Sequence, residues 1–310
     1  MEKKISFNIT SKISLPINSN ANGPFIPNSH NYENNKKILE SIAIAINEKL
    51  PVLLLGETGT GKTSLIRYLA NKTNNNFRRV NHNGGTSIED IIGRTLVNEK
   101  GTFWIDGVLT ESLRKGYWYL ADEINASNAD INFVYHSLLD DDGFIVLPEN
   151  GGEIVRPHEN FRFFGAMNPS ADYVGVKELN KALLSRFIVL KTDFPNPAVE
   201  EKILVKRTGI KSEIAKKMIA FANEIRQNHQ KDKISFVFST RELLSWCSLY
   251  KIYGKYIPSA EITVLNKVND DDFESVKDLL SLHFRTLDNP KAKAEPKEEK
   301  AEEETEENNN

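Results

Sequence analysis

Short apolar runs alternate with amphipathic stretches over the first two thirds of the chain. The runs are Val52–Leu55, Phe77–Val80, Trp118–Ala121, Phe161–Ala166 and Phe187–Leu190. Between them lie stretches with helical spacing, such as Lys62–Asn71, which places Leu65, Ile66 and Leu69 on one side. Apolar strands separated by helices are typical of a parallel sheet covered on both faces, so the pattern predicts an α/β fold with three layers.

From Pro195 onward the pattern becomes helical throughout. Apolar side chains recur every three or four residues in three stripes: Ile214, Ala215, Met218, Ile219, Ala222 and Ile225; Leu243, Leu244, Cys247 and Tyr250; and Phe273, Val276, Leu279, Leu280, Phe284 and Leu287. We therefore expect four parts. They are an extended N-terminal arm (1–30) packed against the core, an α/β nucleotide-binding domain (31–195), a small all-α lid (196–287) and a disordered acidic tail (288–310).

The charge of the chain is unevenly distributed. The net charge is −3, but residues 288–310 contain nine acids and four lysines, so the other 287 residues carry +2. A nearly neutral folded part gives no electrostatic reason for tight duplex binding. No apolar run is long enough to span a bilayer, and the single Cys247 excludes an internal disulfide, so we expect a cytoplasmic protein without a membrane segment.

A Gly-rich segment directly follows the first apolar run and opens a helix. It reads Gly56-Glu57-Thr58-Gly59-Thr60-Gly61-Lys62-Thr63, with Ser64 next, and matches G-x-x-x-x-G-K-[ST]. Glycines let backbone N–H groups wrap around a β-phosphate, and the helix N-terminus adds the positive end of its dipole. Lys62 is expected to bridge the β- and γ-phosphates and Thr63 to ligate magnesium. The segment therefore predicts that residues 56–64 bind ATP with Mg²⁺.

Polar side chains end two further apolar runs. Asp122 and Glu123 follow Trp118–Ala121, and Asn168 follows Phe161–Ala166. Asp122 can hold magnesium through its water shell. Glu123, expected on the opposite face of the pleat, can orient or deprotonate the attacking water, and Asn168 can bridge this acid and the γ-phosphate. Asn81, after Phe77–Val80, is a candidate to hold Glu123 in an idle rotamer.

These motifs together resemble the AAA+ ATPases, in particular the MoxR-type and midasin/dynein-related branch. The resemblance covers about residues 30–250 and is carried by GETGTGKT (56–63), LADEINAS (120–127), FFGAMNP (163–169), ALLSRF (182–187) and FSTRELLSW (238–246). Asp90–Leu109 looks like the helix-2 insertion of that branch, and Asp140–Val155 looks like its hairpin before the sensor strand. The arm before residue 31 and the lid beyond about residue 255 match no such pattern.

The resemblance implies roles that spacing alone does not give. Arg186 corresponds to the arginine finger that reaches the γ-phosphate of a neighbouring subunit, and Arg241 to the second sensor. A homo-oligomeric ring, expected to be a hexamer, follows from a finger that acts in trans. MoxR-type proteins usually work with a von Willebrand A-domain protein, which this chain lacks, so such a partner would be a separate chain.

Four functions remain open at this point. The first is an ATP-driven ring that remodels a protein client, which the two insertions favour. The second is a nucleic-acid motor or restriction-type NTPase subunit, for which Arg78, Arg79, Arg94 and Lys100 form a candidate patch. The guanine-reading N-K-x-D is absent, since Asn71-Lys72-Thr73-Asn74 and Asn266-Lys267-Val268-Asn269 lack the acid. A small-molecule kinase would not use a sensor asparagine or a finger, and Glu123 argues against a scaffold that never hydrolyses nucleotide.

Overall fold

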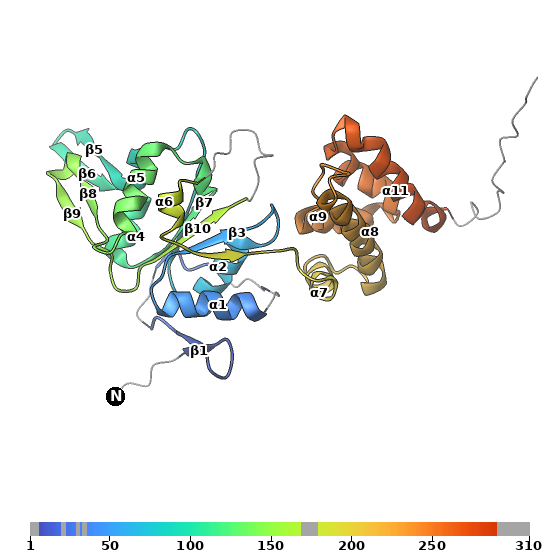
Figure 1. Ribbon diagram of the computed structural model, residues 1–310, viewed down its shortest axis with the longest axis horizontal. Helices are drawn as coiled ribbons and strands as arrows, with labels where there is room; N and C mark the ends of the chain where they lie inside the picture. Colours follow the sequence, from blue (N-terminus) through green and yellow to red (C-terminus); the bar gives the residue numbers. More distant parts are fainter. Residues whose placement is uncertain (1–5, 20–22, 29–31, 33–35, 169–178, 290–310) are drawn as a thin grey trace, which may run out of the picture. The chain divides into compact units, whose positions relative to one another are not determined.

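The protein consists of two compact units, Met1–Glu200 and Glu201–Asn310. The computed structural model describes residues 6–19, 23–28, 32, 36–168 and 179–289 (Figure 1). The buried hydrophobic residues form three clusters. One contains only residues from Leu204 onward, and the other two lie within residues 15–187. Each unit therefore has a core of its own.

The first unit is built on a five-stranded parallel sheet in the order β11-β3-β10-β7-β4. Its strands are β3 (Val52–Leu55), β4 (Phe77–Asn81), β7 (Trp118–Asp122), β10 (Arg162–Met167) and β11 (Ile188–Lys191). Met167 lies opposite Leu55, and Ala166 lies opposite Asp122. The carboxyl ends of β3, β10 and β7 therefore meet at one edge, with β10 in the middle.

Helices cover both faces of this sheet, as the strand pattern predicts. Val52 and Leu54 face α1 (Lys36–Asn47) and α2 (Lys62–Lys72), whereas Leu53 faces the opposite side. The opposite side is covered by α3 (Ile88–Ile92), α4 (Val108–Lys115), α5 (Ala129–Leu138) and α6 (Lys181–Leu184). Because successive strand residues point to opposite faces, the all-apolar run Val52–Leu54 contributes to both cores.

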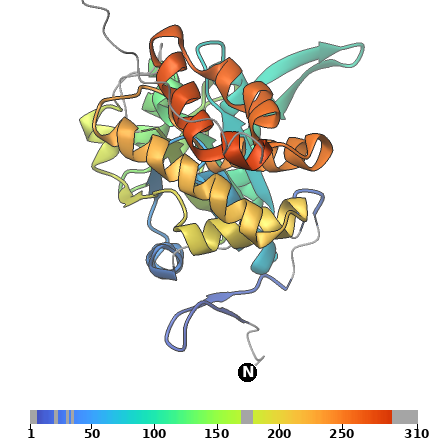
Figure 2. The same cartoon turned by 90° about the vertical axis from the view of Figure 1, so that its right-hand side faces the viewer.

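Two antiparallel hairpins interrupt this α/β pattern. The first joins β5 (Gly93–Asn98) to β6 (Gly101–Asp106), and Figure 2 shows it (teal) as a projecting two-stranded arm. The second joins β8 (Ile145–Leu147) to β9 (Glu153–Val155) through the short 3₁₀ helix η2 (Pro148–Asn150). They lie in the two segments, 90–109 and 140–155, that resemble the insertions of the dynein-related branch.

The N-terminal segment differs from the expected extended arm. Residues Ser6–Asn8 (β1) and Ser14–Pro16 (β2) pair as an antiparallel hairpin. Leu15 is fully buried in the cluster that contains α1, and Phe7, Ile9 and Ile13 pack against it. The abundance of Asn, Ser and Pro in this segment hid the short apolar alternation that forms the hairpin, while its packing against the core is as expected.

The second unit is all-helical, as predicted. It contains α7 (Pro197–Thr208), which begins just before the boundary, α8 (Ser212–Gln230), α9 (Thr240–Tyr253), α10 (Tyr256–Thr263), the 3₁₀ helix η3 (Leu265–Lys267) and α11 (Asp270–Asp288). Its core is rich in aromatic pairs, with Trp246 5.6 Å from Phe221 and 5.3 Å from Phe284 between ring centroids. Across the described ranges, no helix combines the length and hydropathy that a bilayer span requires.

The end of the folded part differs slightly from the predicted boundary. Asp288, expected in the acidic tail, is the last residue of α11, and its carboxylate accepts hydrogen bonds from the backbone N–H groups of Tyr256 and Ile257, both at 2.7 Å. These groups open α10 and have no partner within the helix, so Asp288 caps it. The predicted tail otherwise lies, from residue 290, outside the described residues.

Candidate nucleotide site

The Gly-rich segment forms the loop between β3 and α2. Gly59 and Gly61 have φ angles of 81° and 95°, which glycine adopts without strain. A Cβ on Gly56 would lie 2.1 Å from the carbonyl oxygen of Thr192, so this backbone approach also requires glycine. No side chain caps the N-terminus of α2. The loop therefore presents its backbone and the start of the helix to the same space, an arrangement that suits a phosphate group.

Lys62 lies at the centre of this loop. Its side chain is buried, and its ammonium donates to the carbonyl oxygens of Gly56 (2.5 Å) and Glu57 (2.9 Å) and to Oδ1 of Asn168 (3.0 Å). A buried ammonium is costly unless it is surrounded by acceptors. The loop carbonyls therefore hold Lys62 over the loop.

Thr63 and Asp122 come together from elements 59 residues apart in the sequence. The Thr63 hydroxyl donates to Oδ2 of Asp122 at 2.8 Å, and the same oxygen lies 2.8 Å from Nε of Arg79 on β4. Asp122 is buried at the end of β7, whereas the Arg79 side chain is 45% exposed. The pair is therefore open to solvent only on the side of Arg79.

Asn168 joins the loop to the end of β10. It directly follows β10, the strand between β3 and β7, and the Gly56 N–H donates to the carbonyl of Met167. The Asn168 amide donates to the hydroxyl of Thr58 (3.3 Å) and accepts from Lys62. The strand order thus brings Lys62, Thr63, Asp122 and Asn168 to one edge of the sheet.

Glu123 reaches this edge in a way that the sequence did not predict. It does not continue the pleat of β7, because its backbone turns to the left-handed region (φ 53°, ψ 44°) and starts the 3₁₀ helix η1 (Ile124–Ala126). Its side chain is exposed. The turn, not the alternation of a strand, separates Glu123 from Asp122. A non-glycine residue in this region carries strain of the kind found at functional sites.

The remaining candidate residues lie at other places. Oδ1 of Asn81 accepts from Arg79 at 3.3 Å, and among the described residues no hydrogen bond joins Asn81 to Glu123. Arg186 lies two residues beyond α6, where its guanidinium donates to the carbonyl of Ala182 (2.6 Å) and to Asp140 (3.2 Å). Arg241 is exposed in the first turn of α9 and belongs to the second unit.

Two groups around the loop were not found from the sequence. Thr192, just after β11, is buried, and its hydroxyl lies 3.2 Å from that of Thr60 in the loop. Arg79 was considered only for a nucleic-acid patch, but it pairs with Asp122. Both contacts depend on which strands are neighbours, since β11 flanks β3 and β4 flanks β7. Spacing along the chain carries no signal for them.

A buried polar chain lies behind Asp122. His82 is fully buried, its backbone N–H donates to the carbonyl of Asp122 (2.9 Å), and its Nε2 lies 2.8 Å from the Tyr135 hydroxyl. The Tyr135 hydroxyl lies 2.7 Å from that of Tyr119. Burial lowers the pKa of His82 to about 4, although the nearby Asp122 favours its charged form. His82 is therefore neutral at pH 7.

The residues at this edge fit a nucleotide and magnesium. Thr63 and Asp122 supply the hydroxyl and carboxylate oxygens that Mg²⁺ prefers, and within the described part of the chain no cluster of three or more His, Cys, Asp or Glu side chains could hold a metal. Two protein oxygens suit magnesium because this ion keeps several waters and takes further oxygens from phosphates.

The parallel sheet, the glycine loop after β3 and the acidic end of β7 define the first unit as a P-loop nucleotide-binding domain of the AAA type. Residues 51–187 match the family "AAA domain (dynein-related subfamily)", and residues 200–282 match "CbbQ/NirQ/NorQ C-terminal". The chain belongs to the CbbQ/NirQ/NorQ family of dynein-related AAA+ ATPases. The resemblance inferred from the motifs is confirmed.

Individual relatives agree with this family. The chain is 30% identical to the protein CbbQ of Hydrogenophilus thermoluteolus over 234 residues, which are 75% of this chain and 86% of CbbQ. It is 28% identical over 254 residues to the denitrification regulatory protein NirQ of Pseudomonas aeruginosa, covering 81% of this chain and 96% of NirQ. Midasin of Dictyostelium discoideum is 32% identical over 262 residues, but these are only 4% of midasin.

Proposed function

We propose that this protein hydrolyses ATP with magnesium at the edge formed by β3, β10 and β7, and uses the energy to remodel a protein client. The convergence of Lys62, Thr63, Asp122 and Asn168 on that edge is the observation that supports hydrolysis most directly. Isolated P-loops occur in many nucleotide-binding proteins, but a loop that shares hydrogen bonds with both an acid and a sensor amide suits phosphoryl transfer.

Each side chain then has a distinct role. The backbone of residues 56–64 and the start of α2 bind the phosphates, and Lys62 neutralises charge on the β- and γ-phosphoryl oxygens. Magnesium would be held by Thr63 and, through water, by Asp122, and it would supply charge stabilisation to the phosphates. Glu123 orients and deprotonates the attacking water, and Asn168 holds the γ-phosphate relative to that water.

The proposal extends to an assembly. Arg186 is the residue that would reach the nucleotide of a neighbouring subunit in a homo-oligomeric ring, with a hexamer as the expected form. Arg241 would sense the nucleotide from the helical unit. The two hairpins carry exposed apolar side chains, Phe103 and Ile105 on the first and Val146 and Ile154 on the second. Such exposed apolar residues suit contact with a protein client or with a von Willebrand A-type partner on a separate chain.

A nucleic-acid motor is the weaker alternative. The candidate basic patch is partly neutralised within the unit, because Arg78 lies 2.9 Å from Glu111 and its guanidinium stacks 4.2 Å from the ring of Phe25. Arg79 pairs with Asp122. Arginines that are already paired contribute less to phosphate binding. A steep fall of DNA affinity with salt concentration would favour this alternative.

The proposal is tested by measuring magnesium–ATP binding and hydrolysis for the full chain and for two variants, each with a matched control variant. Lys62→Ala is expected to lose saturable binding, and Lys72→Ala, a matched control on the same helix, is expected to keep it. Glu123→Gln is expected to bind ATP but to hydrolyse it about 10²- to 10⁴-fold more slowly, the usual contribution of a general base. Glu89→Gln, an exposed acid on α3, serves as its control. Turnover by Glu123→Gln equal to that of the parent would refute the role of Glu123.

A further inference from the structure

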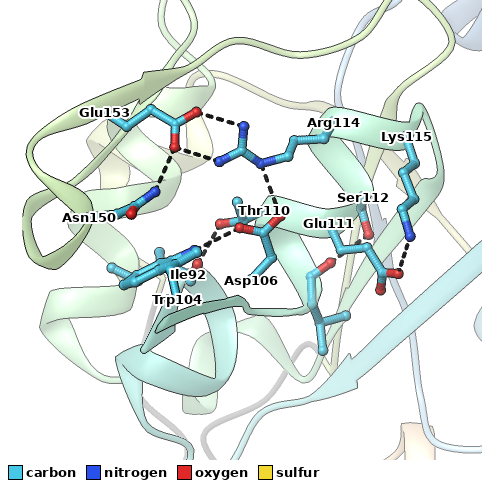
Figure 3. Close-up of polar contacts among 11 residues, drawn as sticks. Ile92, Trp104, Asp106, Thr110, Glu111, Ser112, Arg114, Lys115, Asn150 and Glu153 are labelled. Atoms are coloured by element: carbon cyan, nitrogen blue, oxygen red, sulfur yellow. Dashed lines mark hydrogen bonds and ion pairs between the residues drawn. The ribbon is translucent and has the colours of Figure 1, made fainter. Parts of the chain in front are cut away.

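The two hairpins of the first unit meet at the last turn of α4. β6 ends at Asp106, and α4 begins two residues later at Val108, so the helix directly follows the first hairpin. The second hairpin approaches the same place through Glu153 at the start of β9, and β5 contacts η2. Arg114, in the last turn of α4, lies between the two hairpins (Figure 3).

Arg114 uses its guanidinium to join both hairpins. Its Nε donates to Oδ2 of Asp106 at 2.9 Å, and its Nη1 and Nη2 donate to Oε1 and Oε2 of Glu153, both at 2.7 Å. The contact with Glu153 is therefore bidentate, a geometry that a planar guanidinium provides and an ammonium does not.

Both carboxylates are held in place by a neighbour from their own hairpin. The indole N–H of Trp104 donates to Oδ1 of Asp106 at 2.7 Å, and the amide of Asn150 donates to Oε2 of Glu153 at 2.7 Å. The hydrogen bond from Arg114 lowers the pKa of Glu153, and the same contact raises the pKa of Arg114. A carboxylate that is already held in one orientation loses less conformational entropy when it binds the guanidinium. The contact therefore fixes the relative positions of Asp106 and Glu153 more firmly.

The contact determines position more than stability. The side chains of Arg114, Asp106 and Glu153 are 35%, 26% and 37% exposed. Ion pairs at such exposure add little to the free energy of unfolding. Each hairpin also has a separate attachment to the core, Trp104 for the first and the buried Ile145, Leu147 and Val155 for the second. The Arg114 guanidinium instead joins the two hairpins to each other.

We propose that Arg114 is a positioning residue that fixes the two hairpins to α4 and to each other, so that they move as one body. The link to a client rests on the proposed function, because the hairpins would carry the client-facing surface. The coupling itself is a property of this chain and needs neither nucleotide nor client. The coupling of the hairpins can therefore be tested even if the protein proves not to hydrolyse ATP.

The test is a distance measurement between the hairpins in the full chain. Spin labels are placed at Lys100→Cys, in the turn of the first hairpin, and at Val146→Cys, on the exposed side of the second, in a Cys247→Ala background. Electron–electron double resonance then gives the distribution of label distances. The protein with Arg114 is expected to give one narrow distribution, and Arg114→Met at least a twofold broader one with an unchanged melting temperature.

Three further variants make the result specific. Arg114→Lys keeps the charge but not the bidentate geometry, so it is expected to broaden the distribution too. Glu153→Gln, which is nearly isosteric, is expected to do the same if Arg114→Met fails to fold. Lys115→Met removes a charge from the next residue, whose ammonium pairs with Glu111 of α4 at 2.9 Å and lies 5.9 Å from the ring centre of Tyr117, neither of which belongs to a hairpin; this variant is expected to change nothing. A distribution equally wide in the parent and in Arg114→Met, or equally narrow in both, overturns the proposal.

Discussion

His82 illustrates how a buried residue behind the site can determine a measurable property of the whole protein. It is fully buried; its backbone N–H donates to the carbonyl of Asp122, and its neutral ring contacts the hydroxyl of Tyr135, which in turn contacts that of Tyr119. Among the described residues, none supplies a hydrogen-bond partner for its Nδ1. A protonated ring here would place a charge in the core, which explains why burial lowers the pKa of His82 to about 4.

This lowered pKa predicts a pH dependence of folding. The unfolded chain binds a proton at His82 as the pH falls below about 6.5, but the folded chain does so only near pH 4, so stability decreases through this window. Between pH 7 and pH 5 the loss from His82 alone is about 2 kcal/mol. Urea unfolding of the parent and of His82→Gln, which cannot titrate, measures it. An equal fall in stability for both proteins would show that His82 is not the cause.

At the scale of elements, contacts with Thr192, just after the neighbouring strand β11, shape the loop between β3 and α2. The Thr192 N–H, just after β11, donates to the carbonyl of Leu55 at 2.7 Å, and the Thr192 carbonyl oxygen lies 2.1 Å from where a Cβ of Gly56 would be. The Thr192 side chain contacts Thr60 further along the loop. Gly56 is therefore required by packing against Thr192, in addition to any close approach of a phosphate.

Gly56→Ala is expected to move the loop and weaken nucleotide binding. The new methyl group meets a backbone oxygen at 2.1 Å that the sheet holds in place, and overpacking of this kind costs on the order of 1–3 kcal/mol. If the loop shifts to relieve it, affinity for magnesium–ATP falls about 10- to 100-fold. Calorimetric titration measures this, with Gly84→Ala as the control, because a Cβ there meets nothing within 4 Å. Unchanged affinity in Gly56→Ala would contradict the packing argument.

At the scale of the whole molecule, Arg186 forms an ion pair with Asp140 at the surface of the first unit. Its guanidinium pairs with Asp140, whose side chain is 61% exposed, and with a carbonyl of its own short helix α6. An exposed pair is easily exchanged for a stronger anion such as a phosphate. This position suits the proposed finger that acts on a neighbouring subunit.

The trans role of Arg186 predicts complementation between two inactive proteins. Arg186→Ala is expected to bind ATP and to hydrolyse it about 10³-fold more slowly or worse, the range known for arginine fingers. Lys62→Ala keeps its finger but binds no nucleotide. Steady-state hydrolysis in a mixture of the two should exceed that of either alone, because some interfaces combine an intact loop with an intact finger. If the mixture hydrolyses ATP no faster than its components, Arg186 does not act on a neighbouring subunit.

Much of the fold and part of the site could be predicted from the sequence. The run Val52–Leu55 followed by a glycine segment and an amphipathic helix has local causes: apolar strand positions, glycine torsions and helical periodicity. Neighbouring residues supply these causes, so the pattern predicts them. The β1–β2 hairpin was missed, and Asp288 was assigned to the tail, because the first shows only a short alternation and the second caps α10, which lies 32 residues earlier in the sequence.

The sequence by itself determined the types of element and the glycine-rich loop that joins the first core strand to a helix, since each depends on residues that are close together in the sequence. Only the tertiary structure decided which groups meet there. The order β11-β3-β10-β7-β4 puts Asn168 beside Lys62, Arg79 beside Asp122 and Thr192 against Gly56, and no local pattern encodes strand order. The contact of Arg114 with Glu153 of the second hairpin depends in the same way on packing between segments distant in the chain.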